Sequence, residues 1–293
     1  MSKPTNDQEL RIDYCAIDKH VESSPDLPFP YSLTLYNRRG TSTVGSWYPP
    51  LQGGDDRMRR AAVALAPTCV EAKKHLILTC LNDFDEQPII DLIPDHFGKE
   101  SDTVARLRRL YLSIVSSALS DFLDDVFSQR IVFHSFWKCP ASQHHHHAYR
   151  GGLAAHSIEM AEWVAMASHL GTEERDIGIV YALLHDVGKL WCYSKNGPTD
   201  FQHLGHELTG YTRITKELDA LYAKWPDASI GLRSLMSGMW KVNHTHPILA
   251  VGKLVQAFDQ ASVEKDRRAH KGSGPKPWTP RPENAKATVV KMR

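Results

Sequence analysis

Apolar residues recur with helical spacing through most of the chain from Thr103 onward. They stand three or four positions apart, as expected for one buried face of an α-helix, at Val104, Leu107, Tyr111, Ile114, Val115, Ala118, Leu119, Phe122 and Val126. Comparable patterns predict further helices over residues 153–170, 174–191, 203–221 and 246–266. In the helix at 203–221, the residues expected on or near one face are Leu204, Leu208, Tyr211 and Leu218. The sequence therefore predicts a mainly α fold, with a helical domain over residues 101–265.

The first hundred residues carry weaker patterns. Residues 1–30 are polar and rich in Pro, Ser and Asp, which is typical of a segment without regular structure. Residues 31–40 alternate apolar and polar side chains and predict one or two short strands. Residues 57–84 favour a helix that Pro67 interrupts. We therefore expect an N-terminal extension over residues 1–100 that contains a few short strands.

Length and composition are those of an ordinary globular protein. The 293 residues, of which 42% are hydrophobic, suffice for one large domain or two modest ones. The net charge of +1 favours neither an acidic nor a basic partner. The end of the chain is locally basic, with nine Lys and Arg against three Asp and Glu over residues 264–293. We expect a disordered tail over residues 266–293.

Cysteine usage and hydropathy bear on where the protein works. The five cysteines are widely spaced and form no CxxC pair, which favours reduced thiols over a disulfide framework or a zinc ribbon. The sequence has no charged and apolar leader and no run of about 18 apolar residues. These observations predict a soluble, cytoplasmic protein without a membrane partner.

The stretch "ALLHDVGKL" carries the clearest chemistry. It places His185 and Asp186 next to each other near the end of an apolar helix. Burying either group without a partner costs several kcal/mol, and a metal ion bound by both side chains would remove that cost. Further imidazole and carboxylate groups lie on the other predicted helices, at His156, His206 and Asp259. A helical bundle can direct all of these side chains into one core.

The order His, His-Asp, His, Asp along the chain resembles that of the HD phosphohydrolase superfamily. The resemblance rests on "GGLAAHS", "LLHDVGK", "LGHE" and "FDQAS" and covers roughly residues 103–265. It implies an HD-type helical bundle that binds one or two divalent ions, of Mn, Mg, Fe, Ni or Zn. It also implies an enzyme that hydrolyses phosphate esters, because such ions polarise phosphorus and activate water.

A longer motif is similar to the HD domains that act on nucleic acids. "PASQHHHHAYRGGLAAHSIEMA", followed by "LLHDVGK", resembles two groups of these proteins, the TraI-like (MobH-type) relaxases of conjugative elements and the 3′-5′ exoribonucleases that pair an OB-fold with an HD domain. Both groups show a P-A-S, a His pair, a Gly-Gly-Leu and a His in this arrangement. The resemblance implies a phosphodiesterase or nuclease acting on DNA or RNA. For the relaxase group it also implies assembly with other proteins of a mobile element. Residues 31–100 do not predict the five strands of an OB-fold.

The motifs assign roles to individual residues. The expected metal ligands are His156, His185, Asp186, His206 and Asp259, with His244 or His246 as a sixth. Asp186 could bridge two ions and, with Lys189, forms the expected catalytic pair. The expected substrate contacts are Lys189, Arg150, and the pair His146 and His147.

Several alternatives remain open. His203 stands three residues before His206 and could replace it as a ligand. Lys189 could complement a helix dipole instead of a phosphate. His146 and His147 could support the ligands from behind. The whole protein could hydrolyse nucleotides or cyclic nucleotides, or could bind a metal or nucleotide without catalysis.

Overall fold

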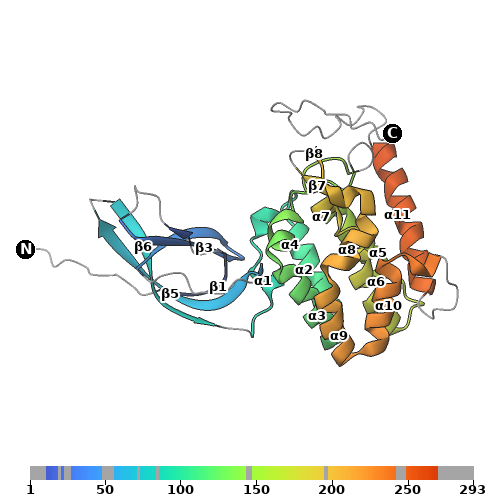
Figure 1. Ribbon diagram of the computed structural model, residues 1–293, viewed down its shortest axis with the longest axis horizontal. Helices are drawn as coiled ribbons and strands as arrows, with labels where there is room; N and C mark the ends of the chain where they lie inside the picture. The colour runs from blue at the N-terminus through green and yellow to red at the C-terminus, as the bar shows by residue number, and fades with distance from the viewer. Residues whose placement is uncertain are drawn as a thin grey trace, which may run out of the picture. The chain divides into compact units, whose positions relative to one another are not determined.

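The computed structural model describes residues 11–18, 21–22, 28–47, 56–70, 73–83, 86–142, 147–194, 197–241 and 249–269 (Figure 1). The chain divides into two compact units, which are considered separately. One unit comprises Met1–Arg108 with Asp124–Phe133, and the other comprises Arg109–Leu123 with His134–Arg293. Among the described helices, none is long and apolar enough to cross a membrane.

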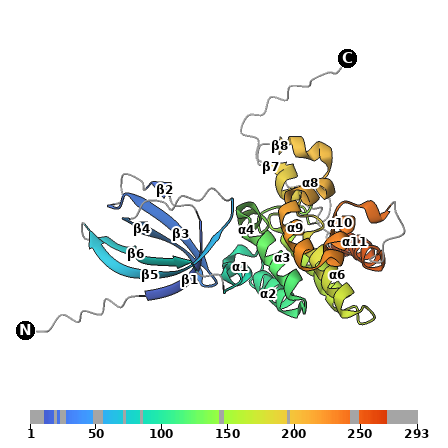
Figure 2. The same ribbon diagram turned by 60° about the horizontal axis from the view of Figure 1, so that its bottom comes forward.

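A β-barrel forms the body of the first unit. Its strands are β1 (Arg11–Ile17), β2 (Val21–Glu22), β3 (Tyr31–Asn37), β4 (Gly40–Ser46), β5 (Arg59–Val70) and β6 (Lys73–Asp83). The strand order is β1-β5-β6-β4-β3-β2, and β1 also pairs with β3, which closes the sheet (Figure 2). The β4–β6 pairing is parallel, and the other pairings are antiparallel. A closed Greek-key barrel with this connectivity has the topology of the OB-fold.

The barrel interior is filled by apolar side chains that alternate with outward-facing ones. The buried cluster consists of Cys15, Ile17, Leu33, Leu35, Val44, Ala61, Val63, Leu65 and Leu78. The predicted strand at 31–40 is present as β3. The expectation that residues 1–30 lack regular structure is wrong for β1. The apolar side chains of Ile12 and Tyr14 are 63% and 47% exposed, so this strand lacks the alternation that identifies a half-buried strand.

The prediction of a helix over residues 57–84 is wrong, because this segment forms β5 and β6. Its alanines and leucines suggested a helix, but pairing with neighbouring strands on both sides overrides that local preference. Among the described residues, Pro67 lies opposite a residue of β6 only. A proline is tolerated at such a position because no second strand there has to accept an N–H from it. Leu65 is the last residue of β5 opposite a described residue of β1, whereas Pro67 pairs with Leu76 of β6.

Short helices close the first unit around a buried carboxylate. The helix α1 (Ile89–Leu92) is followed by the 3₁₀ turn η1 (Asp95–Phe97). Asp124 accepts a hydrogen bond from the Ile90 N–H at 3.2 Å and pairs with Arg60 of β5 at 2.8 Å. Burial raises the pKa of Asp124 to about 6, although Arg60 and the backbone donors oppose the rise. This carboxylate therefore ties the barrel to α1.

The second unit is helical. Three helices are divided between the units, namely α2 (Thr103–Ser113), α3 (Ser117–Ser128) and α4 (Arg130–Ser135). The others are α5 (Gly152–Ala165), α6 (Thr172–Leu184), α7 (Lys189–Cys192), η2 (Asp200–Leu204), α8 (His206–Arg213), α9 (Thr215–Lys224), α10 (Pro226–Met236), η3 (Met239–Lys241) and α11 (Leu249–Ala269). A small hairpin joins β7 (Tyr193–Ser194) to β8 (Gly197–Pro198). All five cysteines of the chain are free thiols.

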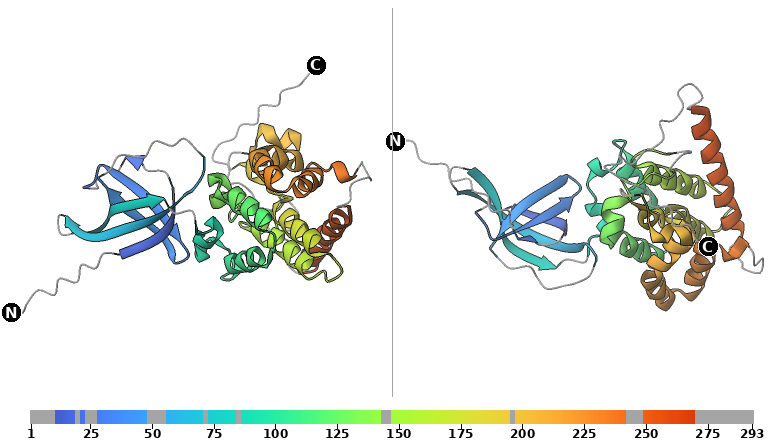
Figure 3. Two further views of the ribbon diagram at one scale, coloured as in Figure 1. Left: turned by 90° about the horizontal axis from the view of Figure 1, so that it is seen from below. Right: turned by 45° about the horizontal axis from the view of Figure 1, so that its top comes forward.

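Three helices of this unit pack closely together, and each carries a residue of the candidate metal site described below. In Figure 3, the orange-red α11 lies alongside the yellow-green α5 and α6. Gly178 of α6 permits this approach. A Cβ at that position would lie 2.9 Å from Val164 of α5 and 2.9 Å from Val251 of α11. The missing side chain therefore brings three backbones together at one level of the bundle.

The continuous helix predicted from Thr103 to Val126 is interrupted between α2 and α3. Asp176 of α6 accepts hydrogen bonds from the N–H groups of Val115 at 2.7 Å and Ser116 at 3.0 Å. A carboxylate from another helix thus caps the start of α3. Val115, which the periodicity placed on the buried face, is 71% exposed.

The predicted helices at 174–191 and 203–221 are also divided. The first ends at Leu184 and α7 starts at Lys189, so the His-Asp pair lies in the break. The second is split into η2, α8 and α9. Leu204 and Leu208 are 52% and 41% exposed, contrary to expectation, whereas Leu218 is buried.

Candidate metal centre

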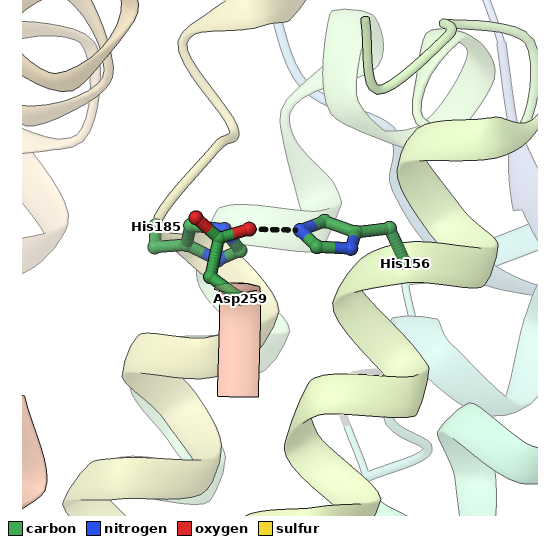
Figure 4. A group of neighbouring side chains, drawn as sticks. All are labelled: His156, His185 and Asp259. Carbon is green, nitrogen blue, oxygen red and sulfur yellow. Dashed lines mark ion pairs between the residues drawn. The ribbon is translucent and has the colours of Figure 1, made fainter. Parts of the chain in front are cut away.

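Two histidines and an aspartate from three helices meet in the second unit. His156 belongs to α5, His185 caps the end of α6, and Asp259 belongs to α11. One ligand atom from each lies within 4.8 Å of the others. His156 Nε2 and Asp259 Oδ1 are 3.2 Å apart (Figure 4). Nitrogen and oxygen donors in such a group are ordinary ligands of divalent transition metals.

Asp186 adjoins this group and connects it to His206. Its Oδ2 lies 3.4 Å from His185 Nε2 and 3.9 Å from His156 Nε2. Its Oδ1 lies 3.1 Å from Nε2 of His206, the first residue of α8. Asp186 is buried, whereas the His206 side chain is 40% exposed. The five residues that the sequence predicted as ligands therefore converge, with His206 and Asp259 at the solvent side.

The charged side chains of the site keep one another ionised. Burial raises the pKa of Asp186, but Lys189, His185 and His206 outweigh burial and hold that pKa well below its usual range. Burial lowers the pKa of Lys189, but the charge of Asp186 and the hydrogen bond to it together outweigh burial, so the pKa lies above its usual value. The Lys189 ammonium forms a buried ion pair with Asp186 Oδ2. Lys189 thus contacts Asp186, and its expected contact with substrate stays a prediction.

The carboxylate of Asp259 is also kept charged. Burial raises its pKa, but the hydrogen bond and the charge that His156 provides when its ring is protonated, together with the charge of His185, outweigh burial, so the pKa lies below its usual value. Both aspartates are therefore ionised at neutral pH, as metal ligands must be.

The hydrogen bonding of His185 leaves one ring nitrogen for a cation. His185 Nδ1 lies 2.8 Å from the carbonyl oxygen of Ala182. A carbonyl only accepts, so Nδ1 carries the proton, and Nε2 of the neutral ring presents a lone pair to the site. Nε2 is buried, and within the described part of the chain its approach to Asp186 lacks hydrogen-bond geometry. The donor set and this buried lone pair fit a divalent ion.

Glycines explain why the motifs around the ligands read "GG" and "HDVGK". Gly151 has a left-handed φ of +84°, which favours glycine. A Cβ on Gly152 would lie 2.0 Å from the carbonyl oxygen of His147. A Cβ on Gly188 would lie 1.9 Å from the carbonyl oxygen of His206. These positions let the chain before α5 and the start of α8 approach the site.

The remaining expected residues fall in different places. His147 lies behind His156, with ring centroids 5.5 Å apart. Arg150 is exposed on the turn before α5, and its phosphate contact stays a prediction. His203, the alternative to His206, is exposed, and the structure places His206 against Asp186. Three expected residues lie outside the described part of the chain, namely His146, His244 and His246.

Two polar residues beside His156 were missed by the sequence analysis. Ser262 Oγ lies 3.2 Å from His156 Nδ1 and donates a hydrogen bond to Glu159 Oε2 at 3.0 Å. Helical spacing could have identified both residues. Glu159 stands three positions after His156, and Ser262 stands three positions after Asp259, so each shares a helix face with a ligand.

The candidate site lies within a segment that matches a family model. The family model described as the HD domain matches residues 153–282. The matched range contains all five converging residues, and the barrel lies outside it. No curated protein and no solved structure gives a significant match to the chain.

Proposed function

Because residues 153–282 match the HD domain, whose superfamily consists of metal-dependent phosphohydrolases, we propose that this protein is a phosphodiesterase that cleaves single-stranded nucleic acid. The observation that carries the proposal is the convergence of His156, His185, Asp186, His206 and Asp259 from separate helices. A purely structural core would gain nothing from burying so many ionisable groups in one place.

The residues of the site have different roles in the proposed reaction. A divalent ion held by the histidines and aspartates would polarise a phosphate ester and lower the pKa of an attacking water. Asp186 remains charged because Lys189 lies against it, so its carboxylate is fixed in orientation. His206 and Asp259 are the most exposed of the five, at 40% and 44%, and are best placed to meet a substrate or a second ion.

The barrel of the first unit supports nucleic acid as the substrate. OB-folds bind single strands through open faces on which bases stack against aromatic side chains. Trp47 directly follows β4 and is 60% exposed, with its ring edge-on to Phe29 at 5.4 Å. Arg38 and Arg39 form the turn between β3 and β4 and can contact phosphates.

The barrel also supports one of the two resemblances found in the sequence more than the other. The exoribonucleases pair an OB-fold with an HD domain, and this chain has a barrel of that topology, which includes β1 in addition to the four strands between residues 31 and 100. This combination favours a nuclease of that type over a relaxase. It also favours a nuclease over an enzyme for free nucleotides, which needs no strand-binding barrel.

Cleavage of labelled single-stranded RNA and DNA with added Mn²⁺, Mg²⁺, Fe²⁺ or Ni²⁺ tests the proposal. We expect the wild type to cleave and Asp186→Asn to lose activity. Trp47→Ala should raise the KM for an oligonucleotide and leave hydrolysis of bis-p-nitrophenyl phosphate unchanged. Tyr222→Ala, which removes a comparably exposed aromatic ring from α9, should change neither.

Three outcomes would contradict the proposal. Equal activity of wild type and Asp186→Asn would show that this site does not take part in hydrolysis. Metal binding without hydrolysis of any phosphate ester would indicate a non-catalytic module. Turnover of mononucleotides that exceeds turnover of oligonucleotides, with no effect of Trp47→Ala, would indicate a nucleotide hydrolase.

A further inference from the structure

A chain of hydrogen bonds runs from His156 to a carboxylate on the side away from the candidate metal. His156 Nδ1 lies 3.2 Å from Ser262 Oγ, and Ser262 Oγ donates to Glu159 Oε2 at 3.0 Å. His156 and Ser262 are fully buried, and the Glu159 side chain is 13% exposed. These hydrogen bonds join α5 to α11, the same two helices that supply His156 and Asp259.

Counting protons along this chain assigns the tautomer of His156. The Ser262 hydroxyl has one hydrogen, and an ionised carboxylate only accepts, so that hydrogen points to Glu159. Ser262 Oγ must then accept from His156, and Nδ1 carries the ring proton. Nε2 is left with its lone pair on the side of Asp259 and Asp186, at 3.2 and 3.9 Å.

His147 reinforces the same arrangement. Its Nε2 lies 3.3 Å from Ser262 Oγ, and its Nδ1 lies 2.9 Å from the Tyr149 hydroxyl. A second N–H donated to Ser262 fills the remaining acceptor site of the hydroxyl and keeps its hydrogen on Glu159. The backbone of His147 has a φ of +50°, unusual for a residue other than glycine, and its carbonyl occupies the space that Gly152 leaves open.

We infer that Glu159 and Ser262 are positioning residues, which hold His156 in the Nδ1–H tautomer and thereby make Nε2 a metal ligand. Groups that fix a ligand histidine in this way typically change metal affinity about 10–100-fold when they are removed. The inference rests on the proposed function only in assuming that the site binds an ion. His147 acts through Ser262 and would contact neither the ion nor the substrate.

The first test reads the tautomer in metal-free, full-length protein by NMR of ¹⁵N-histidine, with His156→Gln to identify the signal. The wild type should show Nδ1–H at His156. In Ser262→Ala and Glu159→Ala the ring should move toward the Nε2–H form, which predominates for neutral imidazole in water. Glu159→Gln keeps an acceptor oxygen for Ser262 and should retain the wild-type tautomer.

The second test measures Zn²⁺ affinity by competition with a chelator. Ser262→Ala and Glu159→Ala should bind Zn²⁺ about 10–100-fold more weakly than the wild type, and Glu159→Gln should bind within a few-fold of it. Ser157→Ala is the matched control. Ser157 is fully buried next to His156, and its hydroxyl has no hydrogen-bond partner among the described residues. This control should change neither the tautomer nor the affinity.

The outcomes separate this inference from the proposed function. A wild type that binds no Zn²⁺ or other divalent ion would contradict the metal centre itself. A wild type that binds Zn²⁺, with tautomer and affinity unchanged in Ser262→Ala and Glu159→Ala, would overturn the inference alone. If Ser262→Ala does not fold, the contrast between Glu159→Ala and Glu159→Gln decides, because Glu159 is partly exposed.

Discussion

Gly188 lies directly against the backbone of His206, so that a Cβ at residue 188 would stand 1.9 Å from the His206 carbonyl oxygen and 2.4 Å from the nitrogen of Gly210. Gly188 itself has ordinary helical backbone angles, with a φ of −61° and a ψ of −19°. Its small size therefore matters, and its conformational freedom does not. The close contact lets α8 begin beside Asp186 and brings His206 Nε2 to 3.1 Å from that carboxylate.

Gly188→Ala should displace the start of α8 and separate His206 from Asp186. Overpacking of this kind typically lowers the free energy of unfolding by about 1–3 kcal/mol. We expect that loss in urea denaturation, together with a tenfold or greater loss of the proposed phosphodiesterase activity. Gly171→Ala is the control, because nothing lies within 4 Å of a Cβ built there. Equal stability and activity in both variants would mean that α8 adapts freely to the extra carbon.

The Lys189–Asp186 pair should contribute strongly to stability in the metal-free protein. Both side chains are buried, so Lys189→Met would leave the Asp186 charge without its nearest cation. Breaking a buried pair in this way lowers the free energy of unfolding by about 3–5 kcal/mol. Because a bound cation would replace part of the missing charge, added Zn²⁺ should stabilise Lys189→Met more than it stabilises the wild type. Thermal unfolding with and without Zn²⁺ measures both effects.

Lys224→Met is the matched control for this prediction. Lys224 pairs with Asp121 at 2.7 Å, but both side chains are more than half exposed. Exposed ion pairs contribute little, so this variant should unfold almost like the wild type and should respond to Zn²⁺ in the same way. A loss of stability at Lys224 as large as at Lys189 would show that charge in general is responsible, and not the buried position.

We expect Asp176 to stabilise the fold without contributing to metal binding. Its Oδ2 accepts from both Val115 and Ser116, so Asp176→Ala leaves two backbone donors at the start of α3 unsatisfied. We expect a loss of about 1–3 kcal/mol in the free energy of unfolding. Zn²⁺ affinity should be unchanged. A large change in affinity would contradict this separation of stability and function.

The convergence of the candidate ligands could be predicted because few residue types bind metals and helices hold their side chains at regular intervals. His185 and Asp186 stood out as ionisable groups in an apolar segment, and His156 and Asp259 fell on helices that pack against it. Helical spacing places Ser262 and Glu159 on the same helix faces as Asp259 and His156, but their residue types alone do not indicate a role at a metal site. They are ordinary polar residues until α5 and α11 bring them to one ring of His156.

The barrel escaped the sequence analysis for a different physical reason. Strand formation in β5 and β6 depends on partners far away in the chain, and the alternation of Ala61, Val63 and Leu65 is weak because alanine fits both helices and strands. The interruption between α2 and α3 is likewise set from outside, by Asp176. Local patterns therefore located the helices well and their breaks poorly.

Metal binding should weaken as the pH falls through the titration of His185. Burial lowers the pKa of His185, but the charge of Asp186 and the hydrogen bond that the protonated ring makes to it together outweigh burial, so the pKa lies above its ordinary value in the metal-free protein. Below that pKa the ring holds a proton that the ion must displace, and the apparent Kd for Zn²⁺ should rise about tenfold for each unit of pH. Above it the ring is neutral and the affinity should level off. Asp186 and Asp259 add no dependence near neutral pH, because their pKa values are lowered.

Calorimetric titration with Zn²⁺ in buffers of different ionisation enthalpy measures this directly, because it reports the number of protons released on binding. We expect His185 to contribute about one released proton below its pKa and a contribution that approaches zero at higher pH. Ser157→Ala should follow the wild-type curve, since its hydroxyl has no hydrogen-bond partner among the described residues. An affinity independent of pH across this range would show that the ion does not compete with a proton at His185, and that His185 is not a ligand.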